Sequence, residues 1–126
     1  MLDRFAAAFE NGDAQALAGL LRDDAVLEMP PFLTWFAGRE TVREFFATRI
    51  ITAPGLFRMV PVAANGQQAF AAYQRAEDED HDDEGVYRAD AIAVPTLTAN
   101  GIARIVTFLD PRLFTTFGLP AEITAA

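Results

Sequence analysis

Ionisable side chains suited to acid–base or metal chemistry gather in one acidic segment. His81 is the only histidine, and it lies in residues 77–84, where seven of the eight residues are carboxylates. A histidine in such a run is expected to be a solvated loop residue rather than a catalytic base. Alternate aspartates there resemble a calcium loop, but Asp83 stands where that loop needs glycine, and Ala89 where it needs glutamate. We therefore predict an acidic loop and no metal site.

Asp90 is a second candidate, because Arg58 or Arg75 could pair with it. Epoxide hydrolysis, for example, uses two carboxylates bridged by an arginine around one water. Strand alternation puts Asp90 on one face with Arg88, Ile92 and Val94, opposite Tyr87, Ala89, Ala91 and Ala93. The second set suits a pocket better, so the pattern favours an ion pair of Asp90 on the sheet surface.

Apolar and aromatic side chains are the candidates for a binding pocket. Trp35 and Phe36 lie in an unusually apolar loop after two prolines, where core packing and ligand contact are equally compatible with the pattern. Strand alternation adds Met59, Tyr73, Tyr87 and Thr107 as further pocket candidates, and Met29, beside the two prolines, is another. The two tyrosines would supply the hydroxyl donors of this pocket.

Composition excludes several classes of function. The net charge is −8, yet without residues 77–84 there remain 11 of the 18 acidic residues against ten arginines. No basic surface is therefore expected for direct binding of nucleic acid. With no cysteine, neither a disulfide framework nor a thiolate zinc site can form. No apolar run reaches the ~20 residues of a membrane span and no signal peptide begins the chain, so we expect a soluble cytoplasmic protein without cofactor.

Hydrophobic periodicity predicts one α+β domain over residues 1–126. Helices are expected over residues 2–9 and 39–48. Between them, Asp13 is expected to cap a further helix whose apolar stripe includes Leu21. A short strand covers 25–29, a loop 32–37, and four strands form an antiparallel meander over 57–64, 67–75, 85–97 and 102–109. A short turn at 113–117 follows. This order predicts helices on one face of a curved, mainly antiparallel sheet.

Three stretches narrow the fold further. They are Met-Pro-Pro-Phe-Leu-Thr-Trp-Phe-Ala-Gly-Arg at 29–39, the segment 60–73 with its Asn-Gly turn, and Phe-Leu-Asp-Pro with Phe-Gly-Leu-Pro within 105–120. Together they resemble the SnoaL-like C-terminal domain of bacterial extracytoplasmic-function sigma factors, which has an NTF2-like cone fold. The two sigma regions that bind DNA and polymerase are absent here. The resemblance implies a regulatory accessory domain that contacts a sigma-factor core or RNA polymerase, in cis or in trans, and binds a small hydrophobic molecule.

Cones of this type also occur in enzymes, so catalysis is the competing hypothesis. Isomerases of this fold need a carboxylate where Met29 stands and a protonated aspartate where Ala93 stands. Because neither side chain can transfer a proton, we predict no catalytic residue and a non-enzymatic role in transcription regulation. The alternative is a SnoaL-like cyclase, isomerase or epoxide hydrolase acting on a small hydrophobic molecule.

Two surfaces are expected to make protein contacts. Val60, Val62, Ile92 and Val94 alternate on two strands and predict self-association of the free domain into a homodimer through its sheet. The tail from residue 110 to residue 120 carries large apolar groups at Leu113, Phe114, Phe117 and Leu119. The tail is either a latch that closes the base of the cone or a contact surface for a sigma core.

Overall fold

The computed structural model describes residues 2–30, 35–64, 66–75 and 86–124. The acidic segment 77–84 with His81, the residues 31–34 and Asn65 lie outside this part, and so do the predictions made for them. The described helices are α1 (Leu2–Glu10), α2 (Ala14–Leu20), α3 (Arg39–Phe45) with a π-helical extension η1 (Phe46–Ile50), and α4 (Leu113–Thr116). The strands are β1 (Leu21–Glu28), β2 (Trp35–Ala37), β3 (Phe57–Ala64), β4 (Gln67–Arg75), β5 (Val86–Thr98), β6 (Gly101–Phe108) and β7 (Glu122–Thr124).

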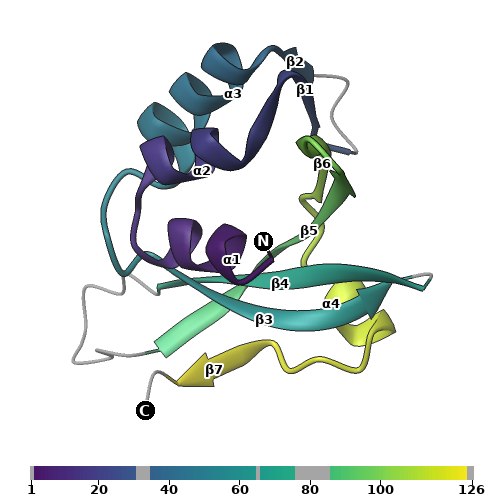
Figure 1. Ribbon diagram of the computed structural model, residues 1–126. Helices are drawn as coiled ribbons and strands as arrows, with labels where there is room; N and C mark the ends of the chain where they lie inside the picture. The colour runs from purple at the N-terminus through teal and green to yellow at the C-terminus, as the bar shows by residue number, and fades with distance from the viewer. Residues whose placement is uncertain (1, 31–34, 65, 76–85, 125–126) are drawn as a thin grey trace.

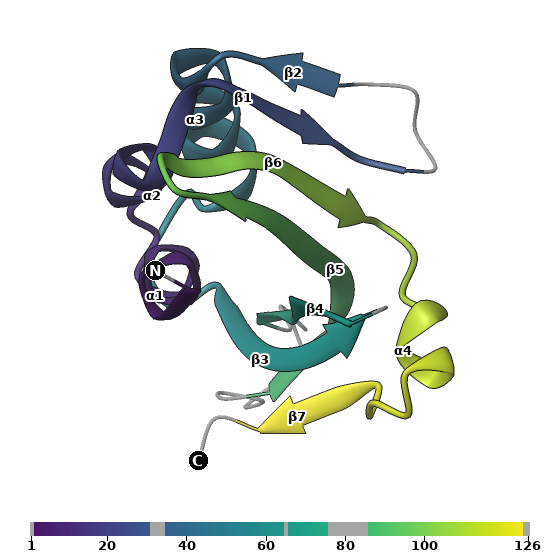
Figure 2. The same ribbon diagram turned by 45° about the vertical axis from the view of Figure 1, so that its right-hand side comes forward.

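One strongly curved sheet organises these elements. Its strand order is β2-β1-β6-β5-β4-β3, and β7 pairs with the beginning of β5. The four predicted strands form the expected antiparallel meander, while β1 pairs with β6 in parallel. Figures 1 and 2 show α1, α2 and α3 on one side of the sheet, with α4 on the other. The predicted α+β class, with helices packed on a curved and mainly antiparallel sheet, is confirmed.

Local signals explain how the helical layer begins. Asp13 caps α2, because its Oδ1 accepts a hydrogen bond from the backbone N–H of Ala16 at 3.0 Å. Gly12 precedes it with φ of 61°, and a Cβ there would lie 2.5 Å from the backbone of Ala53. This close approach brings α1 and α2 against the segment that leads into β3.

Three features of the secondary structure differ from the sequence-based expectation. The second helix ends at Leu20, so Leu21 begins β1 instead of extending the helical stripe. Residues Trp35–Ala37, expected in a loop, pair with β1 as β2. The strand β7 was not predicted. In each case, hydrogen bonds to another strand decide the backbone conformation, and local periodicity does not report them. β1 and β7 pair with strands distant in sequence, whereas β2 pairs with the nearby β1.

The sheet separates two clusters of buried side chains. The inner core lies between the helices and the concave face, and it includes Phe5, Phe9, Leu17, Val42 and Phe46. The outer core lies on the opposite face, and it consists of Ala69, Ala71, Tyr73, Tyr87, Ile92 and Phe114. The tail therefore contributes to the structure, because its α4 closes the outer core.

Within the tail, two phenylalanines have different environments. Phe114 is 2% exposed and its ring makes an edge contact with Tyr73 at a centroid distance of 5.0 Å. Phe117, on the same short element, is 38% exposed. The latch hypothesis thus holds for Phe114, whereas Phe117 is free to contact a partner.

We expect Phe114→Ala to lower the free energy of unfolding by about 3–5 kcal/mol, because it removes a buried ring and leaves a cavity. Phe117→Ala is the matched control, and its loss should be about 1 kcal/mol or less because the ring is partly solvated. Chemical denaturation followed by circular dichroism measures both values. Equal losses for the two variants would contradict this division of the tail.

Candidate functional site

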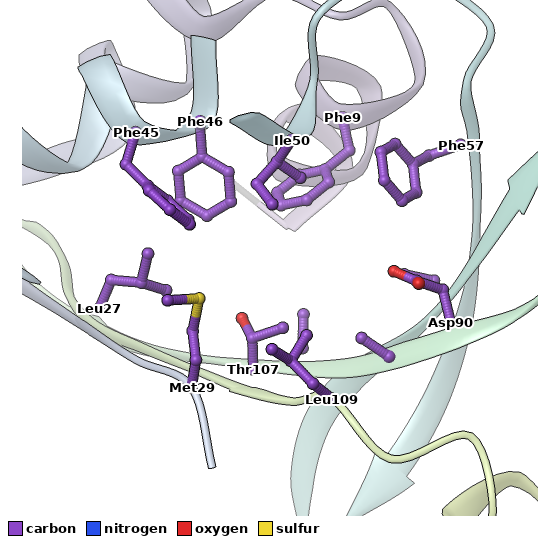
Figure 3. Close-up of a pocket in the computed structure, with 13 residues that line it drawn as sticks. Phe9, Leu27, Met29, Phe45, Phe46, Ile50, Phe57, Asp90, Thr107 and Leu109 are labelled. Carbon is purple, nitrogen blue, oxygen red and sulfur yellow. The ribbon is translucent and has the colours of Figure 1, made fainter. Parts of the chain in front are cut away.

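A small cavity lies between the concave face of the sheet and the helical layer. Its volume is about 30 Å³. Its walls come from α1, the end of α3 with η1, and strands β1, β3, β4, β5 and β6 (Figure 3). The lining residues are Phe9, Leu27, Met29, Phe45, Phe46, Ile50, Phe57, Ala72, Asp90, Ala91, Ala93, Thr107 and Leu109. Only Asp90 and Thr107 of this set carry polar side chains.

Asp90 reaches this cavity because β5 contains a β-bulge. Ala72 of β4 pairs with Ala91, but the next residue, Tyr73, pairs with Ala89. Asp90 is thus an extra residue in β5 without a partner in the β4 register, and such a residue interrupts the alternation of faces. Figure 3 shows its carboxylate pointing into the cavity.

The bulge overturns the predicted position of Asp90. Tyr87 and Ala89 lie in or against the outer core with Ile92, whereas Asp90, Ala91 and Ala93 line the cavity. The predicted surface ion pair is therefore wrong. Strict alternation assumes that β5 has no extra residue. Because the strand contains one, alternation places the residues that precede the bulge on the wrong face of the sheet.

The carboxylate of Asp90 has no salt bridge or hydrogen bond within the described ranges. Burial raises the pKa of this carboxyl, because removal from water disfavours its charged form. Arg58, one of its two predicted partners, lies instead over the Tyr87 ring, with the guanidinium carbon 5.6 Å from the ring centroid. The other, Arg75, is exposed at the end of β4.

Thr107 is the second polar group of the cavity. Its Oγ1 is buried and has no hydrogen-bond partner among the described residues. Figure 3 shows this oxygen turned toward the cavity from the sheet. The site therefore presents one carboxylate and one hydroxyl, both unpaired, in apolar surroundings.

The structure brings together only part of the predicted pocket. Met29 and Thr107 line the cavity, and Met59 is buried in the inner core beside it. Phe36 stacks on the cavity residue Phe45 at a centroid distance of 4.5 Å, but Trp35 is 62% exposed. Contact of any of these residues with a ligand stays a prediction.

The two tyrosines do not line this cavity. The Tyr73 hydroxyl donates a hydrogen bond to the carbonyl oxygen of Pro120 at 2.9 Å, and the Tyr87 hydroxyl donates one to that of Gly55 at 2.7 Å. Both side chains belong to the outer core. Their expected role as cavity donors is therefore wrong, and both hydroxyls instead tie the outer core to nearby backbone.

Several lining residues were not singled out from the sequence. Phe9, Phe46 and Phe57 lie within helices and a strand that the sequence predicts, but none of the three was predicted to line a pocket. Apolar periodicity indicates that such side chains are buried, and it does not indicate that these three rings face one carboxylate. Within the described ranges, no three His, Cys, Asp or Glu side chains are grouped as a metal site would require. No helix in this part of the chain is long and apolar enough to span a membrane.

A second concave region lies on the outer face of the sheet. This outer groove has a volume of about 410 Å³ and runs along β5 and β6 beside α4. It is lined by Gln67, Ile92, Val94, Thr96, Arg104, Val106, Phe108, Leu113 and Phe117. Ile92 and Val94, two of the residues predicted to mediate self-association, thus lie in this groove. Self-association through this face stays a prediction.

Comparisons with known proteins agree on one type of domain. The family described as "SnoaL-like domain" matches residues 2–108. The chain is 35% identical over 124 residues to the C-terminal region of the ECF RNA polymerase sigma factor SigG of Mycobacterium tuberculosis. This match covers 98% of the chain but 32% of SigG, so the chain spans about a third of the length of the curated relative.

Solved structures show the same fold at low sequence identity. An NTF2-like protein of unknown function from Cytophaga hutchinsonii ATCC 33406 is 13% identical with a TM-score of 0.59, and the match covers 90% of each chain. The epoxide hydrolase/cyclase-like enzyme SalBIII, of pyran ring formation in salinomycin, is 22% identical with a TM-score of 0.62. That match covers 86% of this chain and 87% of SalBIII. At such identities the likeness concerns the fold alone.

We expect Asp90→Asn to make the protein more stable at neutral pH. The folded-state pKa of Asp90 is raised, so the folded protein binds its proton more tightly than the unfolded chain does. Stability due to this group is therefore lost as pH rises through the raised pKa, and the amide removes that loss. The advantage of the variant should disappear at acidic pH, where both states are protonated.

Urea denaturation across a pH series measures this difference. Glu44→Gln is the control, because it removes one negative charge from an exposed position on α3 and so reports general charge repulsion. Lower stability of Asp90→Asn than of the wild type at neutral pH, or an equal gain in stability in Glu44→Gln, would contradict this prediction.

Proposed function

Because this chain belongs to the SnoaL-like domain family, we propose that it is a non-enzymatic regulatory domain that acts on the core of an ECF sigma factor. The observation that supports this most directly is the identity of 35% to SigG over nearly the whole chain. About two-thirds of SigG lies outside the match, and that part would supply the surface on which a domain of this kind acts. A cytoplasmic location follows from the proposal, since transcription takes place there.

The cavity favours regulation over turnover. Met29 and Ala93, which stand where isomerases of this fold keep carboxylates, both line it. Asp90 faces no second carboxylate and no arginine within the described lining. Proton transfer between two positioned groups, on which hydrolysis and isomerisation depend, has no support in this arrangement.

The outer groove is our candidate for the contact surface. It combines apolar walls with Arg104 at its edge, and Phe117 of the tail stands partly exposed beside it. Exposed aromatic groups next to an apolar depression are typical anchors of protein interfaces. We therefore assign the groove to the sigma core, in cis or in trans, rather than to RNA polymerase or to a second copy of the chain.

Phe117→Arg should weaken binding of this chain to the part of SigG that precedes the matched region. We expect a loss of at least about tenfold, because an interface anchor typically contributes more than 1 kcal/mol. Trp35→Ala is the matched control, since it removes an exposed aromatic side chain from β2, at the far edge of the sheet. Isothermal titration calorimetry measures affinity, and thermal melts confirm that both variants are folded.

Three outcomes would contradict this assignment. Unchanged binding by Phe117→Arg places the contact elsewhere. A wild-type dimer in light scattering that Phe117→Arg dissociates would assign the groove to a second copy, as the homodimer hypothesis holds. RNA polymerase would replace the sigma core as partner if only the polymerase bound.

The enzyme hypothesis remains the second candidate because of Asp90. A carboxyl with a raised pKa inside an apolar cavity is a common form of catalytic acid. Hydrolysis of a small hydrophobic epoxide by the wild type, abolished in Asp90→Asn, would favour this candidate over regulation. Turnover equal in the two proteins would instead indicate a background reaction.

A further inference from the structure

Within the described residues, the Asp90 carboxylate has no hydrogen-bonding or ionic partner. The bulge turns this carboxylate into a cavity whose other described side chains, Thr107 aside, are apolar. A half-buried carboxylate without a counter-charge costs more free energy in the folded state than a neutral side chain at the same place. The missing element is a group that donates hydrogen bonds or carries positive charge.

Aromatic rings form the wall across from the sheet. The Phe9 ring contacts Phe46 and Phe57 at centroid distances of 5.3 and 6.1 Å, and all three rings line the cavity (Figure 3). Aromatic rings attract organic cations, most strongly where water is excluded. A carboxylate facing such rings matches an ammonium group, which would satisfy Asp90 and present its apolar body to the phenyl groups.

Thr107 strengthens this choice of chemistry. Its unpaired oxygen can accept a hydrogen bond, as the carboxylate can. A hydrocarbon would leave both groups unpaired, and an anion would be repelled by Asp90. The formal net charge of −8 also attracts cations toward the protein.

Phe45 separates the cavity from the surface. It lines the cavity on one side and, on the other, a surface depression of about 340 Å³ that Glu44 and Thr48 also line. The cavity of about 30 Å³ is far smaller than the roughly 300–1,000 Å³ of ordinary ligand pockets. Because Phe45 lines both spaces, binding of a larger molecule in the cavity requires its ring to move from its contacts with Phe36 and Phe46.

We propose that this cavity is a binding site for a small hydrophobic amine, whose ammonium group pairs with Asp90 between the phenyl rings and the sheet. The inference rests on the proposed function, because it names the class of molecule to which the regulatory domain responds. Binding of the amine can nevertheless be measured on this chain alone, without any sigma core.

The test compares cyclohexylamine with cyclohexanol, which have the same ring but different charge. At neutral pH, we expect the wild type to bind the amine at least about tenfold more tightly than the alcohol, measured by calorimetry. Asp90→Asn should remove this preference by weakening the amine alone, and the amine should raise the melting temperature of the wild type only. Glu44→Gln, which removes a charge at the surface depression, should keep the preference for the amine.

Three results would overturn the proposal: equal affinity for amine and alcohol, an amine preference that survives in Asp90→Asn, or no binding of either compound. These results leave the sigma-core assignment standing, because that assignment is tested through Phe117. Conversely, a chain that binds cyclohexylamine through Asp90 but binds no sigma core would retain this site and lose the proposed function.

Discussion

The β-bulge in β5 is the constraint on which the rest of the molecule depends. By inserting Asp90 opposite the Ala72–Tyr73 step of β4, it exchanges the two faces of the strand along its length. Before the bulge, Tyr87 faces the outer core, and after it Ile92 does. A regular strand would direct one of these two large side chains into the inner core and would leave the outer core incomplete.

The bulge also coincides with a change of neighbours along β5. Its first residues pair with β7, while residues from Ile92 onward pair with β6. A bent strand can pair with one neighbouring strand before the bend and with another after it, and bulges commonly produce such a bend. The curvature creates both candidate sites, since the concave face encloses the small cavity and the opposite face carries the outer groove.

The two faces are stabilised by different physical means. The inner core relies on packing between phenylalanines of the helices and the sheet, with close ring contacts such as that of Phe5 and Phe9 at 5.1 Å. The outer core combines packing with hydrogen bonds from Tyr73 and Tyr87 to backbone carbonyls. Against this background, Asp90 and Thr107 are exceptions, because neither polar group has a partner among the described residues and the other described side chains that line the cavity are apolar. Such local departures from the rules of folding commonly mark sites of function.

The sequence by itself determined the type and order of most elements. Apolar stripes on the helices, the hairpin around Gly66 and alternation along the meander led to the α+β class, because these signals are local and repeat with a fixed period. The resemblance to the family came from the three stretches at 29–39, 60–73 and 105–120. Only the tertiary structure decided where alternation fails in β5, how Trp35–Ala37 and β7 pair, and which face receives Asp90 and the two tyrosines. The physical reason is that strand pairing and bulges depend on partners distant in sequence, and one inserted residue reverses the face of every residue on one side of it.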